Sequence, residues 1–524
     1  MYKYKVYWYR WLLVVLMISE IQAIEEKKLT GVNSATSALP VIISYLLENE
    51  KLSGLEKIIA YANGDLSATP SLEDYELAGV SGVTSENIEE VNKRLLQITG
   101  VEVNTIEKLQ IFVDQALYSI TEEKIVRYAK RIQDIEPTLE DYQTIGMRCV
   151  NTQNVEVINQ ALRDETYYDV RDAYFIQQVV YDANNMKNII LDNDAFDPDW
   201  VIMMAATMGL DNACEIHTLG VVTTGTDLNR RQGLSYSAIM HYYGRGDIPL
   251  GLNGRQSMRS YYLDATSYNP KHIDYRGPYV SIDQFESDGC LDYEECYGRN
   301  ESTGMLCALL SNVKRKVTWV IGGHMHNIAN LLRETQLCNG KQLVSEKIDK
   351  IVITSGWTSR TSGEVEMNFS EGTTSPNSAT DATKYLFANR PENVEIVITA
   401  IPNSGTGDPR VGDIFRRDEF QNSPMAFILS VPRYGVYGDH GLSDTDALMY
   451  AVRDVYTKDG FQYTQKINTC FHVNRYGAVT IGNPCGKQDY YLEKTTSDYA
   501  RYLEAEVVPL LENGFQKTLN PEDQ

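Results

Sequence analysis

The chain has 524 residues, a formal net charge of −23 at pH 7 and a hydrophobic fraction of 43%. This length is enough for more than one domain, because domains usually run to about 100–200 residues. The negative charge argues against a nucleic-acid polymer as partner, since phosphate backbones require basic patches, and it leaves small neutral ligands compatible.

The first 23 residues have the pattern of a secretory signal peptide. Lys3, Lys5 and Arg10 form a basic start, residues 11–18 form an apolar core, and Ala23 is a candidate cleavage point. The apolar run is shorter than the roughly 20 residues of a transmembrane helix. We therefore expect a secreted, periplasmic or cell-surface protein without a transmembrane span once the signal is removed. An uncleaved N-terminal anchor is the alternative.

Eight cysteines follow this segment. An even number in an exported chain is compatible with disulfide bonds. Cys470 and Cys485 flank a hairpin-like stretch and form one candidate pair, whose closed loop could contribute about 3 kcal/mol of stability. Cys290 and Cys296 form a second candidate pair.

A tandem repeat follows the N-terminal segment. Three separate stretches recur at a single offset of 67 positions (124 − 57, 139 − 72 and 154 − 87). Self-similarity that keeps one offset over several stretches is the mark of an internal duplication.

Each repeated stretch has the apolar spacing of helices, as at Leu55 and Ile58. We therefore expect a lead-in over residues 24–53 and two all-α bundles over residues 54–120 and 121–186. The two bundles resemble the short helical repeats of bacterial surface proteins. That resemblance implies attachment to a surface or a partner, and no catalysis.

From about Lys187 the pattern changes to short apolar runs alternating with longer helical stretches. Such alternation predicts an α/β domain with a doubly wound, mostly parallel sheet over residues 187–524. The tyrosine-, aspartate- and glycine-rich residues 255–312 are expected to form an insertion or lid. The predicted strands are Ile189–Leu191, Ile216–Val222, Val317–Ile321, Ile348–Thr354, Val394–Ile401 and Met425–Leu429, and the predicted helices include Asp199–Met208 and Leu228–Tyr243.

The first of these apolar runs ends at four carboxylates, Asp192, Asp194, Asp197 and Asp199. Ligands of open α/β sheets bind just beyond the carboxyl ends of the strands. Crowded carboxylates repel one another unless a cation neutralises them, and hard cations such as calcium and magnesium take oxygen ligands. The pattern therefore predicts a metal site at the mouth of the domain, with a solvated acidic turn as the alternative.

Six segments in this half of the chain form an ordered set of motifs. They are Asp192-Asn-Asp194-Ala-Phe-Asp-Pro198-Asp199, Leu219–Thr224, Gly246–Leu250, Trp319–Leu331, Glu366-Met-Asn368-Phe369 and Ser443–Ala447. They resemble, in the same order, motifs of the inosine–uridine-preferring nucleoside hydrolases. The resemblance implies that family's fold and calcium-dependent hydrolysis of an N-ribosidic bond, with magnesium as an alternative ion and a small riboside as the partner. A homo-oligomer is compatible with it.

The resemblance also implies a role for each matching residue. Asp194 would act as general base toward a metal-activated water. His440 is a candidate for protonating the leaving group, because Ser443 stands where the family has its histidine. The implied metal ligands are Asp192, Asp194, Asp199, the carbonyl of His326 and Asp444, and the implied ribose-binding residues are Asp197, Asp227, Asn327, Glu366 and Asn368.

Two departures from the family pattern, Pro198 and Ser443, keep a second function open. It is a non-catalytic, calcium-stabilised protein that binds a ribosyl ligand and is displayed by the helical repeats. A metallophosphoesterase is a third interpretation, suggested by the two histidines of Gly322-Gly-His324-Met-His326. A purely structural surface protein is suggested by the repeats alone.

Overall fold

The structure is a computed structural model of the chain. It forms two compact units, residues 1–177 and residues 178–524, which are described separately below. The described residues contain no helix that is both long and apolar enough to cross a membrane. The predicted signal peptide and nearly all of the predicted lead-in lie outside them. The described residues are 53–194, 199–224, 236, 239–240, 242–253, 301–355, 368–370, 378–400, 414–417, 420, 423–429, 442–454, 457–458, 461–462, 464–494 and 499–516.

The described part of the first unit is built from helices. A helix over residues 53–62 opens it. Apolar side chains at helical spacing, such as Ile58, Val91 and Val113, are fully buried against one another and form its core. The elements that follow are η1 (Leu66–Ala68), α3 (Leu72–Ala78), α4 (Ile88–Leu95), η2 (Gly100–Val103), α5 (Ile106–Ala129), α6 (Leu139–Thr144) and α7 (Val155–Asp164). The boundary between the two units falls within α8 (Ala173–Ala183).

The same polar contacts occur in both repeated stretches. Each has a lysine–aspartate ion pair and a buried hydrogen bond from a tyrosine hydroxyl to an asparagine Oδ1. These contacts are Lys57–Asp74 (2.5 Å) and Tyr75–Asn92 (2.8 Å) in the first stretch, and Lys124–Asp141 (2.6 Å) and Tyr142–Asn159 (2.6 Å) in the second. Helix α5 runs without a break across the boundary expected at residue 120, so one helix belongs to both stretches.

The second unit contains an eight-stranded sheet in the order β3-β2-β1-β4-β5-β6-β12-β9. Neighbouring strands from β3 to β12 are parallel, and only the edge strand β9 runs antiparallel to β12. The predicted α/β architecture with a mostly parallel sheet is confirmed. The strands are β1 (Lys187–Asn193), β2 (Ile216–Thr224), β3 (Leu250–Asn253), β4 (Val317–Ile321), β5 (Ile348–Ser355), β6 (Glu395–Ala400), β9 (Thr464–Thr469) and β12 (Asp489–Lys494).

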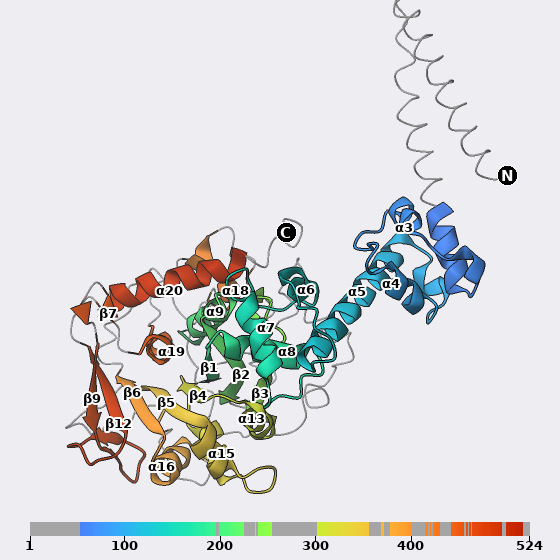
Figure 1. Cartoon of the computed structure of the whole chain (residues 1–524). Helices are drawn as coiled ribbons and strands as arrows, with labels where there is room; N and C mark the ends of the chain where they lie inside the picture. Colours follow the sequence, from blue (N-terminus) through green and yellow to red (C-terminus); the bar gives the residue numbers. More distant parts are fainter. Residues whose placement is uncertain are drawn as a thin grey trace, which may run out of the picture. The chain divides into compact units, whose positions relative to one another are not determined.

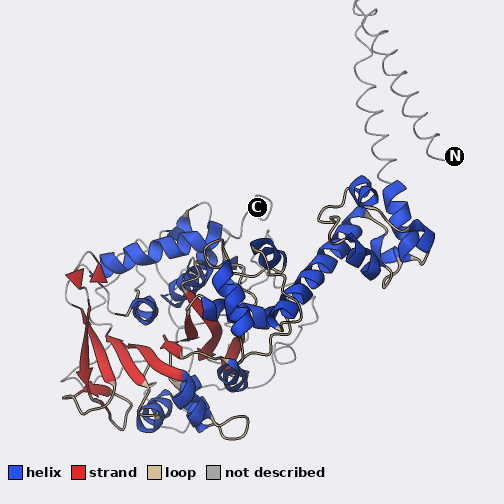
Figure 2. Ribbon diagram, viewed as in Figure 1, coloured by secondary structure: helices blue, strands red, loops and turns tan. Residues whose placement is uncertain are grey.

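Helices cover both faces of this sheet (Figures 1 and 2). The central strands therefore bury side chains on both sides, which explains their continuous apolar runs. One face packs against α9 (Asp199–Asn212), α18 (Pro424–Leu429), α19 (Ser443–Arg453) and α20 (Tyr499–Gln516), and the other against α13 (Glu301–Asn312), α14 (His326–Arg333), α15 (Gly340–Lys347) and α16 (Ala379–Asn389).

The strand order reverses between β1 and β4. From β1 the chain moves outward to β2 and β3, and it then returns to the other side of β1 to build β4, β5 and β6. In an open α/β sheet the loops that leave two such strands diverge to opposite faces and leave a crevice at their carboxyl ends. The sheet therefore places its ligand-binding edge where β1 and β4 end.

Most of the strands predicted in the α/β half are present, and one predicted strand is wrong. Residues Met425–Leu429 belong to α18, a helix that begins at Pro424. A short apolar run fits a buried helix as well as a strand, and proline is favoured in the first turn of a helix. Much of the expected helix over Leu228–Tyr243 and of the expected insertion lies outside the described residues, although residues 301–312 of the latter form α13.

Two small antiparallel pairs complete the second unit. They are β7 (Thr457–Lys458) with β8 (Phe461–Gln462), and β10 (Phe471–Val473) with β11 (Val479–Ile481). A disulfide joins Cys470 to Cys485 at the base of the second pair, as expected from the sequence. Another disulfide joins Cys307 to Cys338. The other expected pair, Cys290 with Cys296, lies outside the described residues.

Candidate functional site

Asp192 is held by two side chains from the β4 strand and the helix after it. Asn327 Nδ2 donates to its Oδ1 at 2.8 Å, and Trp319 Nε1 donates to its Oδ2 at 3.3 Å. Burial raises the pKa of Asp192 well above its usual range, while these two hydrogen bonds lower it. Both carboxylate oxygens of Asp192 have protein donors, so Asp192 fastens the end of β1 to β4 and α14.

Two consecutive glycines after β4 allow two aspartates to approach the backbone. A Cβ placed on Gly322 would lie 2.9 Å from Asp444 Cγ and 3.0 Å from each of its carboxylate oxygens. A Cβ placed on Gly323 would lie 2.7 Å from Asp194 Cβ. The Gly322 N–H also donates to the Asp192 carbonyl at 2.7 Å, which continues the pairing of β1 with β4. The glycine pair thus lies between Asp194 and Asp444.

Asp199 and Asp444 meet at the starts of two helices. The backbone N–H of Asp444, in the first turn of α19, donates to Asp199 Oδ2 at 3.4 Å. Asp199 is the first residue of α9. Both side chains are buried. A negative charge at a helix N-terminus is stabilised by the unpaired N–H groups there. These contacts join residues from β1, β4, α9 and α19 at one edge of the sheet.

Asn368 reaches the same loop from another part of the chain. Its Nδ2 donates to the Gly322 carbonyl at 3.3 Å and to the Thr354 carbonyl, near the end of β5, at 3.1 Å. The side chain is half-buried. Its amide nitrogen therefore holds the loop after β4 in place, a role that the resemblance did not suggest.

The segment around Asn368 is supported by the β10–β11 hairpin. Gly477 at the tip of the hairpin has a φ of +87°, and a Cβ there would lie 2.8 Å from the Phe369 carbonyl. Thr383 Oγ1 donates to the same carbonyl at 2.9 Å. Ser370 Oγ and Thr380 Oγ1 lie 2.6 Å apart. The hairpin tip is thus packed directly beside the residue that supports the glycine pair.

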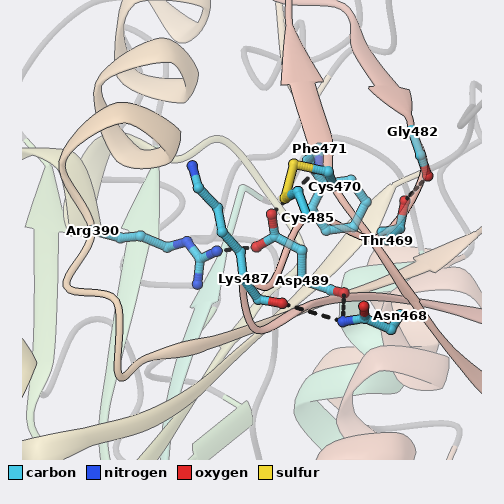
Figure 3. The surroundings of a disulfide bond; sticks show 9 residues. All are labelled: Arg390, Asn468, Thr469, Cys470, Phe471, Gly482, Cys485, Lys487 and Asp489. Atoms are coloured by element: carbon cyan, nitrogen blue, oxygen red, sulfur yellow. Dashed lines mark hydrogen bonds and ion pairs between the residues drawn. A yellow bond between two sulfur atoms is a disulfide. The ribbon is translucent and has the colours of Figure 1, made fainter.

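The base of that hairpin is braced by a buried ion pair (Figure 3). Asp489 accepts a hydrogen bond from the Phe471 N–H at 3.3 Å and forms an ion pair with Arg390. Burial lowers the pKa of Arg390, and the Asp489 carboxylate opposes this by raising it. The Cys470–Cys485 disulfide lies next to Asp489 and ties the two ends of the hairpin together.

His324 lies in the loop between β4 and α14, and His326 lies at the start of α14. Both side chains are buried, and their rings contact each other with centroids 5.5 Å apart. His326 is the first residue of α14, where the carbonyl accepts a hydrogen bond from within the helix. A carbonyl oxygen has two lone pairs, so the metal-binding role expected for it stays a prediction.

The remaining expected site residues, Asp197, Asp227, Glu366 and His440, lie outside the described part of the chain. The sequence also missed two features of this edge. The glycine pair stood in a matching segment and in a histidine motif but was given no role of its own, although two glycines directly after a predicted strand are a sign of close backbone approach. Thr224, at the end of β2, stood in the matching segment Leu219–Thr224 but was given no role.

The donors at this edge fit a hard cation by their chemistry. Asp194, Asp199 and Asp444 offer carboxylate oxygens, which calcium and magnesium prefer. Within the described ranges, one group of three side chains has its ligand atoms within 4.8 Å of one another. It consists of Cys470, Cys485 and Asp489. Its two cysteines are joined in a disulfide, so that group is not a metal centre. Asp194, Asp199 and Asp444 do not belong to that group. That they bind a cation is therefore a proposal.

No protein-family model matches the sequence, and no curated protein matches it either. Solved structures do show similarity. An inosine-uridine preferring nucleoside hydrolase from Bacillus anthracis is 16% identical with a TM-score of 0.41, over 62% of this chain and 100% of that one. A plant nucleoside hydrolase is 14% identical with a TM-score of 0.43, over 62% and 98%. The type III effector protein XopQ, complexed with adenosine diphosphate ribose, is 12% identical with a TM-score of 0.38, over 71% and 100%. At such values these similarities carry no argument about activity, which has to come from the site itself.

Proposed function

We propose that this chain is a metal-dependent hydrolase that cleaves the N-glycosidic bond of nucleosides or related ribosides. The observation that carries the proposal is the meeting of Asp199 and Asp444, with Asp194 across the glycine pair, at the point where the strand order reverses. The order of the sequence motifs supports the same reaction.

Asp194, Asp199 and Asp444 are the proposed ligands of a calcium ion, with magnesium as the alternative. The carbonyl of His326 is a further proposed ligand. Asp192, which accepts hydrogen bonds from Asn327 and Trp319, is proposed to add a further ligand or to hold the end of β1 in place. When bound, such an ion lowers the pKa of a coordinated water and so supplies a nucleophile near neutral pH.

Asp194 is the proposed general base that accepts the proton of the attacking water. Cleavage of a glycosidic bond passes through an oxocarbenium-like state that carries positive charge on the sugar. The buried carboxylates at this edge would stabilise that charge electrostatically. His440 is proposed to protonate the leaving group. The ribose hydroxyls would be bound by Asp197, Asp227, Asn327, Glu366 and Asn368, of which Asn327 and Asn368 also hold the protein contacts described above.

A non-catalytic riboside-binding protein is the second candidate function, and it is favoured by Ser443, the residue before Asp444. Ser443 begins α19, and a serine hydroxyl is not an acid at neutral pH. No specific observation in the described part of the chain favours the metallophosphoesterase interpretation.

The test is release of free ribose from a panel of nucleosides by the purified mature chain, with calcium and with a chelator. We expect chelator-sensitive release that Asp194→Asn abolishes and that Glu346→Gln, an exposed acid of α15, leaves unchanged. Calcium-dependent nucleoside binding without ribose release would decide for the binding protein. Full activity of Asp194→Asn would show that the assigned base is wrong.

A further inference from the structure

Thr224, the last residue of β2, carries a hydroxyl that the proposed reaction does not use. Its side chain is 5% exposed, and its Oγ1 has no hydrogen-bond partner among the residues that the structure describes. Burying a hydroxyl without a partner costs free energy. Buried hydroxyls that lack a protein partner are normally satisfied by an ordered water or a ligand.

The Thr224 hydroxyl lies beside Asp194. A Cβ placed on Gly323 would be 2.7 Å from Thr224 Oγ1 and 2.7 Å from Asp194 Cβ, so both atoms touch the same glycine. The sheet register explains this proximity. Asn193, the last residue of β1, pairs with Thr223 of β2, and the residues that follow these two in the chain are Asp194 and Thr224.

We propose that the Thr224 hydroxyl is a further oxygen donor of the cation site, in contact with the ion that Asp194 binds. The inference rests on the metal site of the proposed function and adds to it a donor from β2. Calcium takes six to eight oxygen ligands, more than three carboxylates supply when each gives one oxygen. A neutral hydroxyl contributes an oxygen without adding to the repulsion among the carboxylates. This also gives the buried hydroxyl the partner that the described protein does not.

The strand that carries Thr224 also offers a matched control. Thr218 lies near the start of β2, is 2% exposed, and likewise has an Oγ1 without a hydrogen-bond partner in the described part of the chain. Six residues of strand separate the two threonines by about 20 Å. Valine has nearly the shape of threonine, so Thr224→Val and Thr218→Val each remove one buried hydroxyl from the same strand. Thr224→Ser keeps the hydroxyl.

The experiment measures cation binding by the full metal-free chain. Calcium is titrated calorimetrically, and terbium is titrated by its emission on excitation of tryptophan, for which Trp319 beside Asp192 is a suitable donor. We expect Thr224→Val to weaken calcium binding about tenfold or more. Thr224→Ser should stay within a few-fold of the wild type, and Thr218→Val should match it. Without calcium, Thr224→Val should melt at or above the wild-type temperature, because the variant no longer buries an unsatisfied hydroxyl.

Three results would overturn the inference. One is calcium binding by Thr224→Val as tight as that by Thr218→Val. Another is a lower melting temperature of metal-free Thr224→Val, which would give the hydroxyl a structural role. The third is a wild-type chain that binds no calcium. Calcium binding that depends on Thr224, in a chain that releases ribose from no nucleoside, would refute the hydrolase and leave the donor in place.

Discussion

The backbone N–H of Asp444 donates to the carboxylate of Asp199 at 3.4 Å, across 245 positions of the chain. This contact brings the N-termini of α9 and α19 together at the carboxyl edge of the sheet. The N–H groups at both helix starts stabilise negative charge, so the fold itself offsets part of the cost of burying two carboxylates there.

Gly322→Ala should damage the site directly. The added methyl would lie 2.9 Å from Asp444 Cγ, so either the loop or the carboxylate must move. We expect calcium affinity and any ribose release to fall about tenfold or more. Gly304→Ala in α13 is the control, because its methyl would meet only Leu337 at 3.9 Å. Alanine is also favoured over glycine within a helix. Equal calcium affinity in the two variants would refute the role of the glycine.

Asn327→Ala should destabilise the second unit. It removes the donor to Asp192 Oδ1, and an unsatisfied buried acceptor costs about 1–3 kcal/mol of unfolding free energy. Asn312→Ala removes an exposed side chain that donates only to the Ala308 carbonyl, and we expect a change within about 0.5 kcal/mol. Urea unfolding of both variants measures this, and equal costs would contradict it.

His217 should make the protein less stable in mild acid. Its ring stacks near Tyr181, and its Nδ1 lies 3.1 Å from Asn188 Oδ1. Burial lowers the pKa of His217 to about 3, with smaller effects from Asp247, which raises it, and Arg315, which lowers it.

In the unfolded chain a histidine binds a proton near pH 6.5, so between that pH and the folded pKa the unfolded state holds more protons. Stability is therefore present above pH 6.5 and falls as the pH drops. From pH 7.5 to pH 5 this histidine should remove about 2 kcal/mol of unfolding free energy. His217→Gln should be less sensitive to pH by that amount in urea titrations, and an identical pH profile would show that the imidazole is not buried.

Gly477→Ala should disturb the segment that carries Asn368. Gly477 and Gly486 have φ angles of +87° and +80°, so alanine costs similar backbone strain at either position. Only at Gly477 would the methyl meet the Phe369 carbonyl, at 2.8 Å, whereas nothing lies within 4 Å at Gly486. Faster amide exchange at residues 368–370 is expected in Gly477→Ala and not in Gly486→Ala. Equal exchange would mean that the hairpin tip does not support this segment.

Tyr75→Phe and Tyr142→Phe should have matching effects in the first unit. Each removes the donor to a buried asparagine Oδ1, at a cost of about 1–3 kcal/mol. Because the two hydrogen bonds occupy equivalent places, the two costs should agree within about 0.5 kcal/mol. Tyr118→Phe, at a half-exposed position of α5, should have little effect. Hydrogen exchange of the full chain reports these costs, and an effect at only one tyrosine would contradict the equivalence.

The sequence predicted the centre of the sheet well, because its strands bury both faces. The continuous apolar run of β1 and its abrupt end at Asp192 and Asp194 follow directly from that burial. The outer strands β3, β9 and β12 were missed. In β9 polar residues such as Gln465 and Lys466 stand at an edge that is only partly covered, so no apolar pattern marks it.

The site was harder to predict because its parts are distant in sequence. Nothing in the residues around Asp444 indicates its contact with Asp199, and only the order of the motifs suggested it. The amide of Asn327 was expected on a ribose, but it also holds Asp192, since only the fold shows that the two side chains face each other. Thr224 ends a matching segment but was given no role, because threonine is common in strands for its shape.

The continuity of α5 determines how the helical part of the chain can change in length. Excision of Lys57–Glu123 would join Glu56 to Lys124, which occupies the place of Lys57 one period later, so the helix would continue in phase. The remaining ion pair of Lys124 with Asp141 and the bond of Tyr142 to Asn159 would be untouched. Whole periods of the repeat can therefore be gained or lost without creating a new junction. The length of a modular spacer is set in the same way, by the number of its repeats.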